Sequence, residues 1–245
     1  MAGTMEAGDG RVSDVVQDLK GLKGPFLLAI VGCYLGYVTL IATSRYPRDL
    51  FFLNEMFMLP VVSMATVMFY QRELGGYFSE IYATFPVSMT GMILRKLGQL
   101  LVFITVFHLA WTWVYLSSFG KMETLVYSYH NQPPYWGEIS WLQLFSQSVP
   151  TYLLLAVLTL LGMVLTKKIY GGLGAGFSLW ILEGLSRGEM LQDLTLYTVY
   201  LPESPDNTAF VVNRMLLITI SLALLTLSIY WANQRHKWII TDEPN

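Results

Sequence analysis

The feature that most constrains this chain is the arrangement of its apolar residues in long, nearly uninterrupted blocks. Each block holds about 17 to 22 predominantly apolar residues, which is enough for one helix to cross the hydrocarbon core of a bilayer. A backbone exposed to lipid must form its hydrogen bonds within its own helix, so we interpret each block as a membrane-spanning helix. Six are predicted, with the approximate bounds Pro25–Thr43, Phe51–Tyr70, Leu97–Ser118, Val149–Thr166, Tyr170–Leu185 and Met215–Ala232.

Composition agrees with this interpretation. Of the 245 residues, 54% are hydrophobic and 13% are charged, against roughly 25% charged in soluble domains. The expected fold class is an all-α membrane protein, and no hydrophilic segment of this sequence has the length of a soluble catalytic domain. The single cysteine, Cys33, excludes an intrachain disulfide and a cysteine metal site. The formal net charge of −2 indicates no particular partner.

The positions of lysine and arginine predict the orientation. With the N-terminus in the cytoplasm, the inner loops and tails hold ten of these residues and the outer loops hold five. The positive-inside rule therefore favours a multi-pass protein of the plasma membrane with both termini cytoplasmic. A cleaved secretory signal over residues 20–43 is the competing interpretation, but the apolar run is too long and lacks a small-x-small cleavage site.

The segments between and around the spans divide the chain further. Residues 1–24 are expected to form a cytoplasmic tail with an amphipathic helix on the inner membrane surface, and residues 233–245 a second cytoplasmic tail. The transmembrane domain covers 25–232. Its two long outer loops are 119–148, which is rich in the aromatic residues that favour the headgroup region, and 186–214, whose apolar patch could dip into the outer leaflet as short helices.

A glycine-rich run opens the fifth predicted span. Residues 171–176 read GGLGAG, which resembles a phosphate-binding loop only superficially, because Phe177 follows where a Walker loop requires Lys-Ser/Thr. Gly172 and Gly176 instead form a small-xxx-small face that lets two membrane helices approach closely. Gly32 and Gly36 predict the same kind of face in the first span.

Several polar residues lie inside the predicted spans, where an ionisable group is a candidate functional residue by default. His108 lies near the middle of the third span with Trp111 on the same face, and Glu55 and Glu183 lie toward the outer ends of spans two and five. These four residues are candidates for a substrate pathway. The alternatives are a neutral His108 that bonds a neighbouring helix, and ion pairs between the two glutamates and Arg48, Arg187 or Arg214. No spacing of histidines suggests a metal site.

The loop from Gln71 to Lys96 is more elaborate than a simple connection requires. Gly75-Gly76 ends the second span and permits a sharp turn. A short helix over 77–85 then carries an apolar stripe at helical spacing, and the proline after it stops that helix. A stripe on so short a helix must lie on lipid or dock into a partner. The apolar stripe consists of Phe78, Ile81, Tyr82 and Phe85, and the proline that ends the helix is Pro86.

This loop resembles that of the type-2 permease family of ATP-binding-cassette (ABC) exporters. Members of the family carry a glutamate and glycine after the second span, a short coupling helix, a Pro-x-Ser step and a basic residue entering the third span. The sequence supplies Glu73, Gly75 or Gly76, the helix 77–85, Pro86-Val87-Ser88 and Lys96. The six spans, the surface helix before the first and the structured loop before the last also match, although residues 186–214 are less apolar than the corresponding loop of the family.

The resemblance implies a permease subunit whose coupling helix docks into a separate ABC ATPase. It further implies a second permease subunit, as a homodimer or a paired heterodimer, and export of an amphipathic or hydrophobic substrate such as a drug, an antimicrobial peptide or a lipid. The chain itself is expected to be no enzyme and to bind no cofactor or nucleic acid, with ATP and Mg on the partner ATPase. The alternatives are a membrane-embedded lipid-modifying enzyme that uses His108, Glu55 or Glu183, and a secondary carrier, for which we find no inverted repeat.

Overall fold

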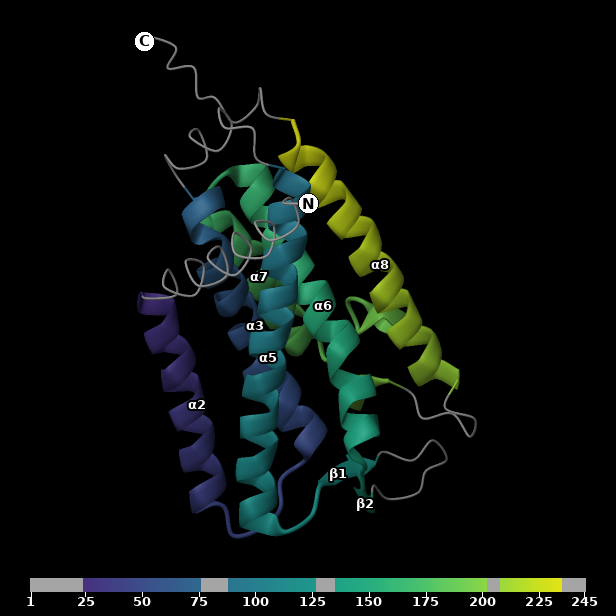
Figure 1. The fold of residues 1–245 in the computed structure, drawn as a ribbon. Coiled ribbons are helices and arrows are strands. Elements are labelled where there is room, and N and C mark those ends of the chain that lie inside the picture. Colours follow the sequence, from purple (N-terminus) through teal and green to yellow (C-terminus); the bar gives the residue numbers. More distant parts are fainter. Residues whose placement is uncertain (1–23, 76–87, 127–134, 202–207, 235–245) are drawn as a thin grey trace, which may run out of the picture.

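The structure, a computed structural model, describes residues 24–75, 88–126, 135–201 and 208–234 (Figure 1). Most of this part of the chain is helical, as predicted. The long helices are α2 (Pro25–Thr43), α3 (Leu50–Leu74), α5 (Met89–Phe119), α6 (Trp141–Thr166), α7 (Ile169–Ser186) and α8 (Thr208–Ala232).

Five of these helices, all except α7, are long and apolar enough to cross a membrane. Their presence confirms the prediction of a helical, multi-pass membrane protein, whereas its orientation stays a prediction. With 18 residues, or about 27 Å of helix, α7 is at the lower limit of length for a span, and it is rich in glycine. The fifth predicted span, Tyr170–Leu185, is therefore supported less strongly than the other five.

Several helix bounds differ from the predicted ones. α2 begins and ends where we expected, but α6 begins at Trp141 rather than Val149, and α8 at Thr208 rather than Met215. The predicted outer loops 119–148 and 186–214 are therefore too long at their C-terminal ends. The cause is that the first two turns of each helix mix polar residues with apolar ones, and a search for uninterrupted apolar blocks excludes such a stretch.

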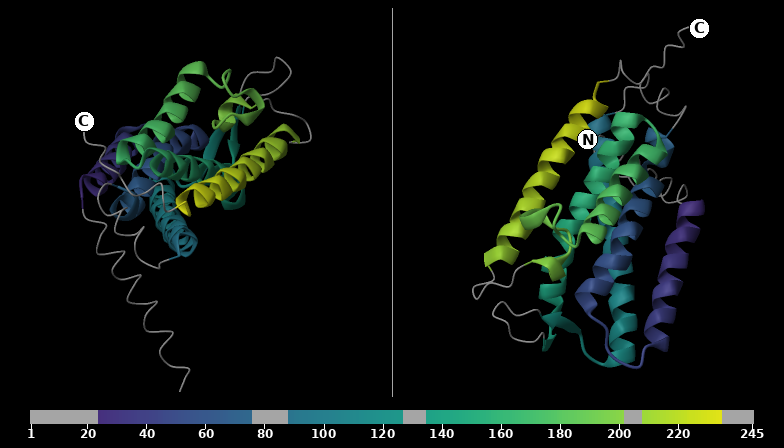
Figure 2. Two further views of the ribbon diagram at one scale, coloured as in Figure 1. Left: turned by 90° about the horizontal axis from the view of Figure 1, so that it is seen from above. Right: turned by 180° about the vertical axis from the view of Figure 1, so that it is seen from behind.

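The helices pack around a centre made of α3 and α6, the two most buried spans. α7 packs on both of them, while α2 and α8 lie at opposite edges of the bundle (Figures 1 and 2). Pro60 in α3 and Pro150 in α6 each remove one hydrogen bond from the helix interior.

A small two-stranded antiparallel sheet, which was not predicted, connects α5 to α6. Strands β1 (Glu123–Val126) and β2 (Tyr135–Glu138) pair with Thr124 opposite Gly137. The Thr124 hydroxyl donates a 2.6 Å hydrogen bond to Asp49 at the start of α3. Burial raises the pKa of Asp49, although this hydrogen bond opposes the shift. We call this side of the bundle the hairpin end.

The segment 187–201, between α7 and α8, folds back into the bundle. It contains two short 3₁₀ helices, η1 (Gln192–Leu194) and η2 (Thr198–Tyr200), and lies between α7 and α8 at mid-height (Figure 2). The side chains of Thr195, Leu196 and Tyr197 are buried. This folded-back segment places irregular backbone near the hairpin end of the bundle.

The glycine pattern of the fifth span is confirmed as a packing face. A Cβ added to Gly172 would meet the Thr159 carbonyl of α6 at 2.8 Å, and one added to Gly176 would collide with the hydroxyls of Thr159 and Ser63. The same prediction is wrong for Gly32 and Gly36, since no heavy atom of the described residues lies within 4 Å of a Cβ at either position.

We predict that Gly176→Ala destabilises the protein by about 1–3 kcal/mol, because the added methyl group overfills the contact between α7, α6 and α3. Gly174→Ala is the matched control, since nothing lies within 4 Å of a Cβ there. It should be neutral or stabilising by up to about 1 kcal/mol, the difference in helix propensity. Thermal unfolding of both variants in one detergent checks this, and equal losses would contradict the packing assignment.

Candidate functional site: a buried polar network at the hairpin end

A buried ion pair joins α3 to α8. The Arg214 guanidinium lies 3.9 Å from the Glu55 carboxylate, and both side chains are almost completely buried. The Thr198 hydroxyl bridges them, since it donates to Glu55 at 2.6 Å and accepts from Arg214. The Arg214 side chain also donates to the Thr151 hydroxyl of α6. The predicted pairing of Glu55 with an arginine at similar depth is therefore confirmed.

The same residues satisfy the backbone of the folded-back segment. Glu55 accepts a 2.7 Å hydrogen bond from the Thr198 backbone N–H. The Asn213 amide, next to Arg214 on α8, donates to the carbonyls of Asp193 at 2.7 Å and Thr195 at 3.1 Å. Irregular backbone is tolerated at membrane depth only where the protein itself supplies such partners. The network thus holds the folded-back segment in place.

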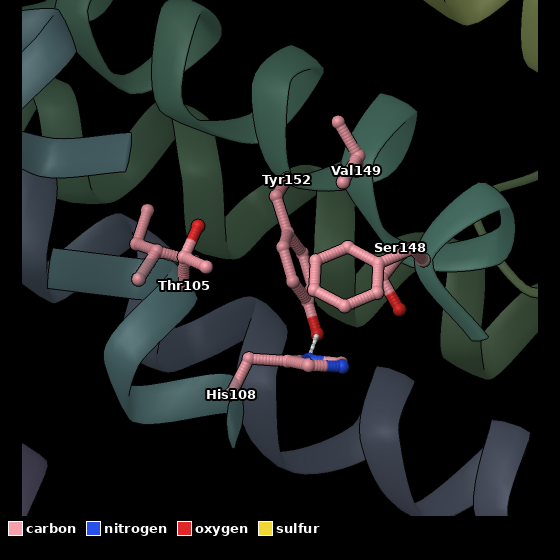
Figure 3. A pocket seen from close by; sticks show the side chains of 7 residues that line it. Thr105, His108, Ser148, Val149 and Tyr152 are labelled. Carbon is pink, nitrogen blue, oxygen red and sulfur yellow. Dashed lines mark hydrogen bonds between the residues drawn. The ribbon is translucent and has the colours of Figure 1, made fainter. Parts of the chain in front are cut away.

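A chain of hydrogen bonds leads from Glu55 to His108. The Gln147 amide donates to Glu55 at 2.5 Å, and the Asn54 amide donates to Gln147 at 2.9 Å. The Tyr152 hydroxyl donates to Asn54 at 2.6 Å, and His108 Nδ1 lies 2.9 Å from the Tyr152 oxygen (Figure 3). Three side chains from α3 and α6 thereby connect a carboxylate on α3 to an imidazole on α5. We call Glu55, Gln147, Asn54, Tyr152 and His108 the polar chain.

The other two candidates for a substrate pathway lie outside the polar chain. Trp111 stacks on Tyr37 of α2 and contacts Phe57 of α3, so it belongs to an aromatic cluster. Glu183 on α7 is fully buried, and neither of its carboxylate oxygens has a hydrogen-bond partner among the described residues. The structure thus joins Glu55 to His108 and leaves Trp111 and Glu183 apart from them.

A second buried ion pair lies at the opposite end of the bundle. Lys96 Nζ on α5 lies 2.6 Å from the Glu73 carboxylate on α3 and donates to the Phe69 carbonyl at 2.7 Å. Tyr70 donates to the Ile93 carbonyl at 2.7 Å, so α3 and α5 are joined at two levels.

Of the predicted coupling residues, Gly75 ends α3 and packs against Ile169, which lies 3.1 Å from a Cβ built on the glycine. Ser88 caps α5, accepting from the Gly91 backbone N–H. The remaining predicted coupling residues lie outside the described residues: Gly76, Phe78, Ile81, Tyr82, Phe85 and Pro86.

Sequence reasoning missed most members of the polar chain. Asn54 precedes Glu55 inside an apolar block, and this polar pair was the available signal. Gln147 was assigned to a loop because the start of α6 was placed too late. The capping box formed by Ser140 and Gln143 marks the true start of that helix. Tyr152 carried no signal, because an apolar span tolerates a tyrosine without requiring a partner.

The polar chain contains an acceptor, hydrogen-bond relays and an imidazole, but its groups do not match a metal centre. No group of three or more histidine, cysteine or acidic side chains able to hold a metal ion occurs among the described residues. Comparison with protein-family models, with curated proteins and with solved structures found no match. The class of the protein, a helical multi-pass membrane protein, therefore follows from its fold and composition.

Substitution of the two buried glutamates should have opposite effects. Glu55→Gln removes the charge that compensates Arg214 and should cost about 3–5 kcal/mol, the usual penalty for breaking a buried pair. Glu183→Gln removes a carboxylate without a hydrogen-bond partner among the described residues, so it should be neutral or stabilising. Thermal unfolding in one detergent distinguishes the two. A loss of stability in Glu183→Gln as large as that in Glu55→Gln would contradict the different roles assigned to them.

Proposed function

We propose that this chain is the membrane subunit of an ABC exporter, with the type-2 permease fold, that moves an amphipathic or hydrophobic molecule across the plasma membrane. The observation that carries the proposal is the buried pair of Glu73 and Lys96. These residues flank the segment 76–87, which holds the predicted coupling helix, and they belong to the motif that resembles the ABC permease family.

The contacts on both sides of that segment would let it act as a lever on α3 and α5. Glu73 lies one residue before the last residue of α3, and Lys96 lies in the second turn of α5. Separating two buried charges costs about 3–5 kcal/mol, so a push on the segment between them would move α3 and α5 together. Gly75 packs on Ile169, which would carry the movement on to α7.

In this proposal the energy comes from another polypeptide. The sequence contains no Walker motif, so ATP and Mg would bind to a separate ATPase whose groove receives the coupling helix. Two permease subunits, either identical or paired, would enclose the pathway between them. ATP-driven closure of the ATPases would then rock the helices that the buried pair connects to the coupling segment.

Phe78→Asp combined with Tyr82→Asp tests the proposal, because both changes put charge on the predicted docking stripe. The tagged chain is purified from its native membranes, and ATP hydrolysis in the purified sample is measured. We expect the wild-type chain to co-purify with an ATPase subunit. In the double variant, ATP hydrolysis in the purified sample should fall at least about tenfold, which corresponds to a loss of about 1.4 kcal/mol in binding free energy.

Ser79→Asp combined with Thr84→Asp is the matched control, since it adds the same charge to the opposite face of the predicted helix. It should retain the ATPase activity, and all variants should elute as folded, monodisperse protein. An ATPase activity that survives the Phe78 and Tyr82 changes would contradict the assignment. So would substrate transport by the purified chain without any ATPase, which is the behaviour of a secondary carrier.

A further inference from the structure

The polar chain has a fixed direction that starts at Glu55. A carboxylate only accepts hydrogen bonds, so Gln147 must turn its amide nitrogen toward Glu55, and its carbonyl oxygen then faces Asn54. A flipped amide would place the carbonyl oxygen of Gln147 against the negative charge. Asn54 uses both of its N–H groups on Gln147 and Ser148. Its carbonyl oxygen is thus left to accept from Tyr152.

The direction determines the tautomer of His108. Tyr152 has one hydroxyl proton, which it donates to Asn54, so its oxygen can only accept from His108 Nδ1. The histidine is 2% exposed, and a buried imidazole is neutral unless a charge compensates it. A neutral ring protonated at Nδ1 carries a lone pair at Nε2. That nitrogen is buried and has no hydrogen-bond partner among the described residues.

His108 lines a small pocket between α5 and α6 (Figure 3). The hydroxyl protons of Thr105 and Ser148 are already donated to the carbonyls of Leu101 and Leu144. The histidine is therefore an acceptor in a pocket whose hydroxyl groups offer no donor. The lining consists of Ile104, Thr105, His108, Phe145, Ser148, Val149 and Tyr152, none of which is acidic, so nothing in the lining would compensate a cationic ligand.

The pocket lies at the lateral surface of the bundle. Val149, in its rim, is 44% exposed, and Thr105, in its lining on α5, is exposed as well. Exposed apolar side chains on membrane-spanning helices face lipid. A ligand would therefore reach His108 from within the membrane.

We propose that this pocket binds the neutral hydroxyl group of a membrane amphiphile. The hydroxyl would donate its proton to His108 Nε2, and the apolar body would lie along Leu142 and Val149, two exposed apolar residues on one face of α6. The same chemistry is offered by an alcohol-bearing lipid of the bilayer and by a hydroxylated transport substrate. Binding can be measured on this chain alone, so its failure would leave the proposed exporter function untouched.

The first test determines the tautomer by ¹⁵N NMR on the full chain in phosphatidylcholine nanodiscs. His130→Gln and His236→Gln leave His108 as the single histidine of the sequence. We expect a protonated Nδ1 and an unprotonated Nε2. The opposite tautomer, or an imidazolium, would overturn the proposal.

The second test adds 1-hexadecanol or its methyl ether, which has nearly the same shape but no proton to donate. The alcohol should perturb Nε2 and bind roughly threefold to tenfold more tightly than the ether, as expected for one hydrogen bond. Equal responses to both compounds, or none, would overturn the proposal. A phosphatidylcholine bilayer contains no alcohol-bearing lipid, so a preference seen there belongs to the added probe. Retention of the same preference after phosphatidylglycerol, whose headgroup carries hydroxyls, is added would favour a substrate-like ligand over a bilayer lipid.

Three variants distinguish the role of His108 as a hydrogen-bond acceptor from its role in packing. His108→Phe should abolish the preference for the alcohol, whereas Tyr152→Phe keeps the histidine but releases its tautomer and should reduce the preference. His108→Gln supplies an amide oxygen as acceptor and should restore it in part. If His108→Phe fails to fold, Tyr152→Phe decides the matter, because an unchanged preference in that variant would overturn the role of the polar chain.

Discussion

The hairpin end of the bundle depends on one requirement, that backbone removed from water must find hydrogen-bond partners inside the protein. Helices meet the requirement by themselves, but the folded-back segment 187–201 does not. Glu55 accepts from its Thr198 N–H, and Asn213 donates to its Asp193 and Thr195 carbonyls. The segment lies beside the α3 and α8 residues that satisfy it, so its position follows from this small set of contacts.

Two buried carboxylates pair with a cation, one at each end of the bundle. Glu55 with Arg214 joins α3 to α8, and Glu73 with Lys96 joins α3 to α5. α3 takes part in both pairs and packs on α6 and α7 as well. A displacement of either end of α3 would therefore reach most of the bundle, which is what the proposed exporter function requires of the helix that precedes the coupling segment.

Much of the fold was predictable because lipid imposes strong rules on sequence. Five apolar blocks became helices that can span a membrane, α2 with the expected bounds. The cost of an isolated buried charge predicted that Glu55 would pair with an arginine, and the structure selects Arg214 from the three that were considered. The rest was harder to predict for physical reasons. A helix whose first turns mix polar and apolar residues, such as α6, escapes a search for apolar blocks. The small sheet follows from turns and pairing that apolar periodicity does not report.

The polar chain was the least predictable part of the site. Periodicity places His108 on one face of α5, but it does not say which helix that face meets. The partner Tyr152 depends on how α5 and α6 are rotated against each other, and Gly32 and Gly36 failed as a packing signal for the same reason. By contrast, Gly176 succeeded because α6 and α3 approach it closely. Sequence alone thus identified the residues that cannot be left unpaired better than it identified their partners.

The claim on which this account rests most is that Glu55 and Arg214 act as one unit that holds α8 and the folded-back segment to α3. A double-mutant cycle with Glu55→Gln, Arg214→Met and the combined variant tests it directly by reversible unfolding in one detergent. The account predicts that the combined loss of stability is smaller than the sum of the single losses by about 1–3 kcal/mol. Losses that add to within about 0.5 kcal/mol would show two independent residues and contradict the claim.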